Sequence, residues 1–212
     1  MSAAQCEEAI THGIEVVRSL PGNALLLGEM GIGNTSAAAL LLARLGGHAL
    51  VDCVGAGTGL DATGVARKLA VLERVLGLHA DAVAPLAALA AFGGFEIAAM
   101  VGAVLQAAAE RRVIVVDGFI SSAAVLVASR LAPAVLERCV FSHRSGEFGH
   151  GLMLRDLGPR PGVPAHALLH LGLRLGEGSG AALAWPLLQS ACAVLNEMAT
   201  FASAGVAARS DG

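Results

Sequence analysis

Hydrophobic and polar positions along the 212-residue chain repeat a pattern of short apolar run, glycine-rich turn and helical stretch. The clearest examples begin at the apolar runs 24–27, 49–54 and 113–116, and a fourth candidate strand covers Cys139–Phe141. Strands that alternate with helices are typical of a mostly parallel sheet. The pattern therefore predicts a three-layer, Rossmann-like α/β fold with helices on both faces of the sheet.

Helical stretches are recognised by apolar residues that recur every three or four positions. The predicted helices cover about 1–20, 37–45, 63–76, 121–130 and 181 to about 201. The first opens on the capping-box pattern Ser2-Ala3-Ala4-Gln5. We expect one nucleotide-binding and catalytic domain over 1–212, in which the terminal helices (about 1–20 and 181–206) belong to a smaller helical subdomain. A helix this close to Met1 leaves open whether Met1 is a true start or an internal methionine.

The apolar segment Ala82–Ala109 raises the question of a membrane span. Gly93, Gly94 and Glu96 interrupt it near its middle, and a charge is costly at that depth in a bilayer. We therefore predict a pair of buried helices here. The N-terminus has no signal-peptide pattern, which favours the cytoplasm.

Composition narrows the classes of function. Hydrophobic residues make up 55% of the chain and aromatic residues 3%, so the core must consist mainly of Ala, Leu and Val. The formal charge of −3 comes without a run of Lys or Arg, which argues against a nucleic-acid partner. The four cysteines are widely spaced without a CxxC pair, as in a reduced cytoplasmic protein.

The glycine-rich turns are the first candidates for ligand binding. In a parallel sheet the strand-to-helix turns converge at one edge, and glycine lets free backbone N–H groups approach an anion. Several such turns together indicate a phosphorylated ligand, although each glycine alone could serve only a tight turn. A P-loop motif is absent, and Gly31-x-Gly33-x-x-Ser36 is only a partial dinucleotide fingerprint.

Three carboxylates are candidates for acid–base chemistry. Glu29 lies in a glycine-rich strand end, Glu177 stands between Gly176 and Gly178, and Asp117 follows an apolar strand. A carboxylate in such a place can accept a proton from an incoming nucleophile if burial raises its pKa. The alternative for both Glu177 and Asp117 is helix capping or a structural ion pair with Arg174 or Lys68.

Other chemistries find less support. Lys68 and Arg67 could face a phosphate or simply solvent. The closest approach to a metal-ligand pattern is His166 and His170, so we predict no metal site and no cofactor. The chain has no nucleophile-elbow motif for serine or cysteine catalysis.

The motifs together resemble those of nicotinate-nucleotide:dimethylbenzimidazole phosphoribosyltransferases, in the same order and over nearly the whole chain. The matching segments are 28–35, 57–61, 93–98, 117–120, 143–145, 175–181 and 197–201. The resemblance implies transfer of phosphoribose from nicotinate mononucleotide to 5,6-dimethylbenzimidazole, which gives α-ribazole 5′-phosphate and nicotinate in cobalamin lower-ligand assembly. It also implies a homodimer and neither a metal nor another cofactor.

The resemblance also assigns roles to residues. Glu177 would be the catalytic base that removes the imidazole proton, and Glu29 would lie beside the benzimidazole. Asp117 would support the site. The phosphate and ribose would be held by Gly31, Gly57, Thr58, Lys68 and Ser145.

Some positions depart from the family pattern. Ala56 and Ala62 replace a basic and an acidic residue, which bears on phosphate affinity, and Phe148 and His170 replace a proline and an aspartate. An N-terminal region of the family, with part of the small helical domain and of the base pocket, is not matched. The unmatched region leaves open a module that binds nicotinate mononucleotide without catalysis. The partial fingerprint at Gly31 leaves open a dinucleotide-dependent oxidoreductase.

Overall fold

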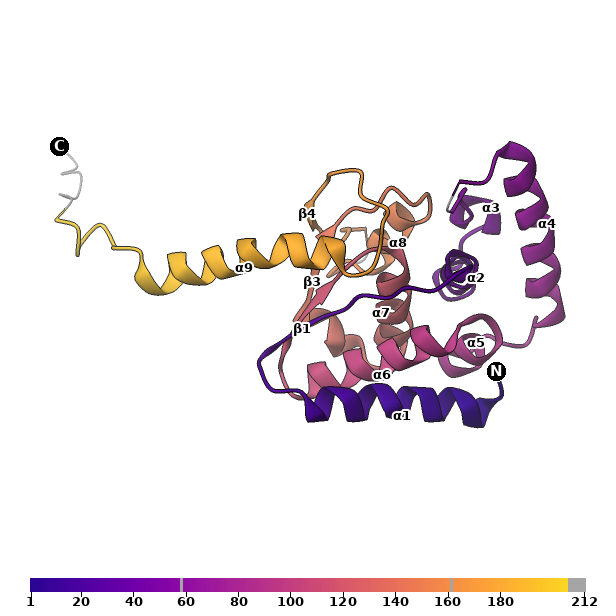
Figure 1. Cartoon of the computed structure of the whole chain (residues 1–212), viewed down its shortest axis with the longest axis horizontal. Coiled ribbons are helices and arrows are strands. Elements are labelled where there is room, and N and C mark those ends of the chain that lie inside the picture. Colours follow the sequence, from indigo (N-terminus) through magenta and orange to yellow (C-terminus); the bar gives the residue numbers. More distant parts are fainter. Residues whose placement is uncertain (58, 161, 206–212) are drawn as a thin grey trace.

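The computed structural model describes residues 1–57, 59–160 and 162–205. In chain order its elements are α1 (Ala3–Ser19), β1 (Ala24–Leu26), α2 (Asn34–Gly46), α3 (Leu50–Cys53), α4 (Ala62–Leu78), α5 (Pro85–Phe92), α6 (Phe95–Ala109), β2 (Val113–Val116), α7 (Phe119–Leu131), the 3₁₀ helix η1 (Pro133–Arg138), β3 (Cys139–His143), α8 (His150–Asp156), β4 (Ala167–Leu169) and α9 (Ser179–Glu197). Figure 1 shows how these elements are arranged.

The sheet of the described residues has four parallel strands in the order β1-β2-β3-β4. In β2, the consecutive residues Ile114, Val115 and Val116 are all buried. Because successive side chains of a strand point to opposite faces, both faces of β2 are covered. Helices α6 and α7 pack against β2, and α9 contacts β2, β3 and β4. The predicted three-layer α/β fold is confirmed.

One local prediction was wrong, one strand was not predicted, and one helix is shorter than predicted. Residues 49–54 do not form a strand, because Leu50–Cys53 is the short helix α3, in which the Val54 N–H donates to the Leu50 carbonyl at 3.1 Å. Strand β4 was not predicted, since three residues at the edge of a sheet carry little pattern. Helix α9 ends at Glu197 rather than near Phe201.

Helix α1 packs lengthwise along α6, and glycines set the spacing between them (Figure 1). A Cβ added to Gly13 would lie 1.8 Å from the Ala99 carbonyl oxygen, and one added to Gly102 would lie 1.9 Å from that of Ile10. Only glycine fits at either position, so the two backbones touch. At the start of α1 the predicted capping box between Ser2 and Gln5 is confirmed.

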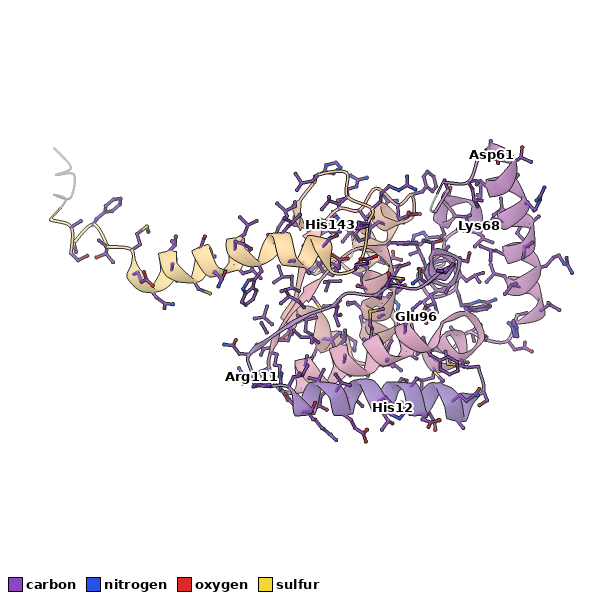
Figure 2. The ribbon with its side chains drawn as sticks, viewed as in Figure 1. His12, Asp61, Lys68, Glu96, Arg111 and His143 are labelled. Carbon is purple, nitrogen blue, oxygen red and sulfur yellow. The ribbon has the colours of Figure 1, made fainter. Side chains whose placement is uncertain are left out.

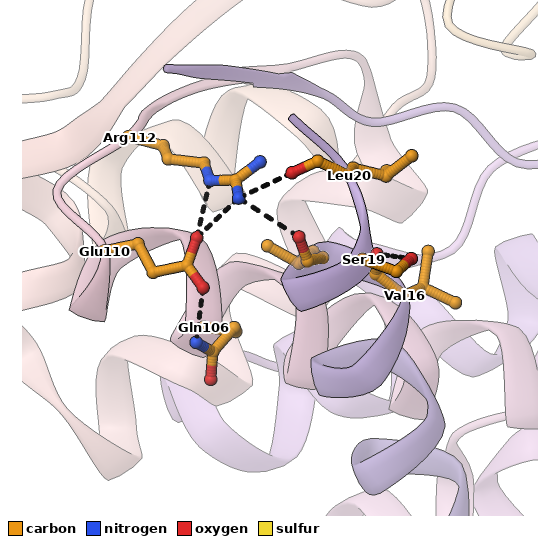
Figure 3. A network of polar contacts seen from close by, with 7 residues as sticks. Val16, Ser19, Leu20, Gln106, Glu110 and Arg112 are labelled. Atoms are coloured by element: carbon orange, nitrogen blue, oxygen red, sulfur yellow. Dashed lines mark hydrogen bonds and ion pairs between the residues drawn. The ribbon is translucent and has the colours of Figure 1, made fainter. Parts of the chain in front are cut away.

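Arg112, just before β2, joins the end of α1 to the end of α6 (Figure 3). Its Nη2 donates to the carbonyl oxygens of Val17 at 3.1 Å and Leu20 at 2.8 Å, and its Nε donates to Glu110 at 2.7 Å. Gln106 donates to the other Glu110 oxygen. The guanidinium thus satisfies free carbonyls at a helix C-terminus and is itself paired.

The helix pair predicted within 82–109 is confirmed as α5 and α6, with Leu89, Ile97 and Val101 fully buried. Within the described ranges, no helix combines the length and apolar character needed to cross a bilayer. Helix α9 extends away from the rest of the molecule (Figure 1). It is buried only at Gly180, Ala181 and Ala184.

Candidate functional site

A cavity of about 830 Å³ lies where the four described strands end. Each strand contributes to its lining through the residues that follow it, as expected for ligand sites in parallel sheets. The lining includes Glu29 and Gly31 after β1, Asp117 and Gly118 after β2, His143 and Ser145 at β3, and Gly176 and Glu177 after β4. Its volume falls in the usual range of small-molecule pockets.

The turn after β1 folds around the Glu29 carboxylate. Its Oε2 accepts hydrogen bonds from the Gly31 N–H at 2.9 Å and from the Asn34 side chain. Burial raises the pKa of Glu29, and these two hydrogen bonds oppose the rise. The Gly31 N–H is therefore committed to Glu29 in this structure.

Glu177 stands at the cavity in an unusual backbone conformation. Its φ is 58°, and Gly176 and Gly178 on either side each have a φ of 76°. A non-glycine residue in the left-handed region stores strain that the surroundings must hold. The Glu177 N–H donates to the Glu29 carbonyl at 3.1 Å, while its side chain is exposed. The local fold thus presents this carboxylate to the cavity.

Among the described residues, the Glu177 side chain forms no ion pair and caps no helix, so the alternative interpretation of this residue is not supported. Arg174 donates to the Gly57 carbonyl oxygen, and Lys68 donates to Thr35 Oγ1 at 3.1 Å and the Gly55 carbonyl at 3.4 Å. The N-cap of α9 is Gly178.

Asp117 is buried at the end of β2 and acts on α9. Its Oδ1 accepts a hydrogen bond from the Ala181 N–H at 3.0 Å, and its carbonyl oxygen accepts one from Ser142 Oγ at 3.0 Å. A carboxylate that accepts from a first-turn amide stabilises a helix N-terminus. Asp117 therefore holds α9 in place from a different element.

The cations of the site gather around Gly57. Besides the bond from Arg174, a Cβ added to Gly57 would lie 3.7 Å from Lys68 Nζ. Lys68 is half-buried, and burial lowers its pKa while Glu147 raises it. Lys68 is outside the cavity lining, whereas Gly57 and Arg174 belong to it.

Ser145 and His150 form a buried polar cluster behind the cavity. The Ser145 N–H donates to His150 Nδ1 at 2.8 Å, and His150 Nε2 lies 3.1 Å from Ser122 Oγ. Burial, with His143 and Arg144 nearby, lowers the pKa of His150 to about 3. Because Nδ1 accepts a hydrogen bond, His150 is neutral and carries its proton on Nε2.

The structure brings together most of the predicted site residues. Those that line the cavity are Glu29, Gly31, Gly57, Asp117, Ser145 and Glu177. Lys68 lies behind Gly57, and Thr58 lies outside the described residues. Within the described residues, no three His, Cys, Asp or Glu side chains gather closely enough to hold a metal ion.

Sequence reasoning assigned no site role to His143 or Asn34, and it named Arg174 only as a possible ion-pair partner. His143 and Asn34 lie inside the motifs at strand ends, which is the signal that could have identified them. Only the fold shows that all three line the cavity.

Comparisons with known proteins agree with this geometry. A phosphoribosyltransferase family matches residues 1–206. Relatives named nicotinate-nucleotide–dimethylbenzimidazole phosphoribosyltransferase include one from Variovorax paradoxus, 68% identical over 97% of this chain and 57% of its own length, and one from Cupriavidus necator, 59% identical over 99% and 60%.

The crystal structure of CobT from Thermus thermophilus superposes with a TM-score of 0.90 at 39% identity, over 99% of this chain and 62% of that one. The chain thus spans 57–62% of the length of these relatives. It belongs to the nicotinate-nucleotide–dimethylbenzimidazole phosphoribosyltransferase family.

Proposed function

We propose that this chain transfers phosphoribose from nicotinate mononucleotide to 5,6-dimethylbenzimidazole. Family membership supports the reaction class. The observation that carries the proposal is the exposed Glu177 carboxylate, held at a cavity of about 830 Å³ that all four described strand ends line. The reaction belongs to the assembly of the cobalamin lower ligand.

Positive and negative side chains lie at different ends of the cavity. Arg174 and Lys68 lie at the Gly57 turn, whereas Glu29 and Glu177 lie together at the turns after β1 and β4. Cations and backbone N–H groups favour a phosphate, and carboxylates favour groups that carry protons. The phosphate therefore binds toward Gly57, with Ser145 and Thr58 as further ligands, and the benzimidazole binds toward Glu29.

In this orientation Glu177 acts as the general base. One imidazole nitrogen of the benzimidazole forms a bond to C1′ of the ribose while the bond from C1′ to the nicotinate nitrogen breaks. The proton on the other imidazole nitrogen passes to the Glu177 carboxylate, and nicotinate leaves with the electron pair of the broken bond. Attack on the face opposite the leaving group converts the β-nucleotide into the α-product. Glu29, whose pKa is raised, lies beside the acceptor base, and Gly31 closes the turn around it.

A second candidate is a module that binds nicotinate mononucleotide without turnover. The observation that favours it is that the chain spans 57–62% of the length of its relatives. In the longer relatives, we infer, α1 and α9 belong to a smaller helical subdomain that completes the base pocket. The family match lends no support to a dinucleotide-dependent oxidoreductase.

Turnover separates the two candidates. The chain is incubated with nicotinate mononucleotide and dimethylbenzimidazole, and nicotinate and α-ribazole phosphate are followed by chromatography. We expect Glu177→Gln to lower kcat by about 10²–10⁴-fold, as for loss of a general base. The matched control Glu73→Gln, at an exposed position of α4, should keep full activity. Folded protein that binds the nucleotide but gives no product would identify the binding module instead.

We also propose that the chain works as a cytoplasmic homodimer. Four free cysteines support a reducing compartment. Apolar side chains that remain exposed on α9, among them Leu183 and Leu195, support a second copy as the cover. A charge placed on this face of α9 should therefore weaken self-association.

A further inference from the structure

The segment that carries Glu177 into α9 is held by contacts from two other strand ends. The Glu177 N–H donates to the Glu29 carbonyl at 3.1 Å, and the Ala181 N–H donates to Asp117 Oδ1 at 3.0 Å. A Cβ added to Gly28 would lie 2.7 Å from the Gly178 nitrogen, so these backbones touch. The turns after β1 and β2 therefore fix two sides of this segment.

His143, the last residue of β3, supplies a third side. A Cβ added to Gly180 would lie 2.0 Å from His143 Cδ2, and one added to Gly118 would lie 3.4 Å from His143 Nε2. Figure 2 shows His143 next to the start of α9. The imidazole ring therefore fills the space between the two glycines, and the first turn of α9 rests against it.

Hydrogen bonding does not explain this histidine. Both ring nitrogens of His143 are buried without a partner among the described residues, and Nε2 lies 3.8 Å from Asp117 Oδ1, beyond hydrogen-bond distance. The neighbouring His150 has partners for both of its nitrogens. Because burial of an unpartnered polar group costs stability, hydrogen bonding gives no reason for an imidazole at this position. The close contacts of the ring with Gly180 and Gly118 beside the cavity give one.

We propose that His143 is a positioning residue for Glu177, a proposal that rests on Glu177 as the base of the proposed reaction. The ring stops the first turn of α9 from moving toward β3. Asp117 holds the same turn because its carboxylate accepts a hydrogen bond from the Ala181 N–H. Glu177 lies three residues before Gly180 and is kept at the cavity in its strained conformation. A shift of about 1 Å in a catalytic group can cost about a hundredfold in rate.

The test separates positioning from substrate binding. We expect His143→Ala to lower kcat by about 10–100-fold while the Kd for nicotinate mononucleotide, measured by calorimetry, changes by less than about threefold. Gly180→Ala should lower kcat in the same way, because its methyl group pushes α9 off the ring. In the double variant the methyl group occupies the space left by the imidazole, and its remaining close contact is with Asp117 Oδ1 at 2.9 Å. The kcat of the double variant should therefore exceed that of Gly180→Ala alone and stay below that of the parent. Gly77→Ala on α4, where the added Cβ meets nothing within 4 Å, is the control and should leave kcat unchanged.

Hydrogen exchange at the Glu177 and Ala181 amides provides a readout without turnover. His143→Ala should speed exchange at both amides, and Gly77→Ala should not. If His143→Ala does not fold, His143→Asn, which also leaves a gap beside Gly180, takes its place.

The outcomes are distinct. A loss of nucleotide affinity that matches the loss of kcat would make His143 a substrate ligand and overturn the positioning role. Effects of the two single variants that simply multiply in the double variant, or unchanged exchange, would overturn it too. Faster exchange in the His143→Ala variant, when the parent chain itself shows no turnover, would support the positioning of α9 and sink the proposed activity.

Discussion

Helices α7 and α9 begin at the same cavity and have similar apolar compositions, but they are buried to very different extents. Every residue from Phe119 to Ser129 in α7 is buried, whereas α9 is buried only at Gly180, Ala181 and Ala184. Helix α7 packs against α2, α6 and α8, while the main contacts of α9 are with strands. The apolar composition of a helix therefore indicates that its surface is to be buried, but it does not identify the element that packs against it.

The two helices consequently serve the site in different ways. Helix α7 anchors the turn after β2, including Asp117 and Gly118, through its packed core. Helix α9 is held at its first turn by Asp117 and His143, and that turn follows Glu177. Substitutions in α7 should therefore lower the free energy of unfolding, and substitutions along the exposed face of α9 should weaken self-association.

The largest difference should appear when a leucine is truncated in each helix. Leu126 on α7 is fully buried and Leu195 on α9 is 85% exposed. Leu126→Ala should lower the free energy of unfolding by about 2–5 kcal/mol, because it removes buried contacts and leaves a cavity. Leu195→Ala should change it by less than about 0.5 kcal/mol when both proteins are measured at concentrations where the chain is a monomer. Urea unfolding followed by circular dichroism measures both, and equal losses would show that α9 is as well packed as α7.

A smaller effect should follow from a charge placed on the exposed face of α9. Leu187 is 45% exposed, and Leu187→Glu should weaken self-association by about 1–3 kcal/mol while the fold remains intact. Analytical ultracentrifugation gives the dissociation constant. Gln189→Glu adds the same charge at an exposed polar position of the helix and is the control. A parent chain that sediments as a monomer at all concentrations would refute the dimer.

The smallest effect concerns the stability at acid pH of the buried region around α7. His150, bonded to Ser122 of α7, has its pKa lowered to about 3, so below the ordinary pKa of about 6.5 the unfolded chain binds a proton that the folded chain does not. Stability should therefore fall as pH falls, by about 1 kcal/mol between pH 6.5 and 5.5 for this group. Denaturant titrations of the parent and of His150→Gln at the two pH values isolate its share. If the free energy of unfolding changes equally between the two pH values in the parent and in His150→Gln, the pKa of His150 does not differ between the folded and unfolded states.

Sequence patterns predicted the elements that carry strong local signals. The apolar run Val113–Val116, followed by Asp117-Gly118, is a strand and turn as predicted. The run 49–54 was predicted as a strand, but a short apolar run fits either a strand or a buried helix, and it has no neighbouring strand among the described residues. Strand β4 is stabilised by its pairing with β3, in which Phe141 lies opposite Ala167, and such pairing leaves little local trace.

For the site, sequence patterns indicated which residue types stand at strand ends and which carboxylate lies between glycines. These features depend on neighbours in the chain, because φ angles and helix starts are set within a few residues. Only the tertiary structure decided that Asp117 binds the amide of Ala181, 64 positions later in α9, that His143 supports Gly180, and that Arg174 reaches Gly57. The physical reason is that hydrogen bonds and close packing act over ångströms in space, and the fold alone determines which distant residues come that close.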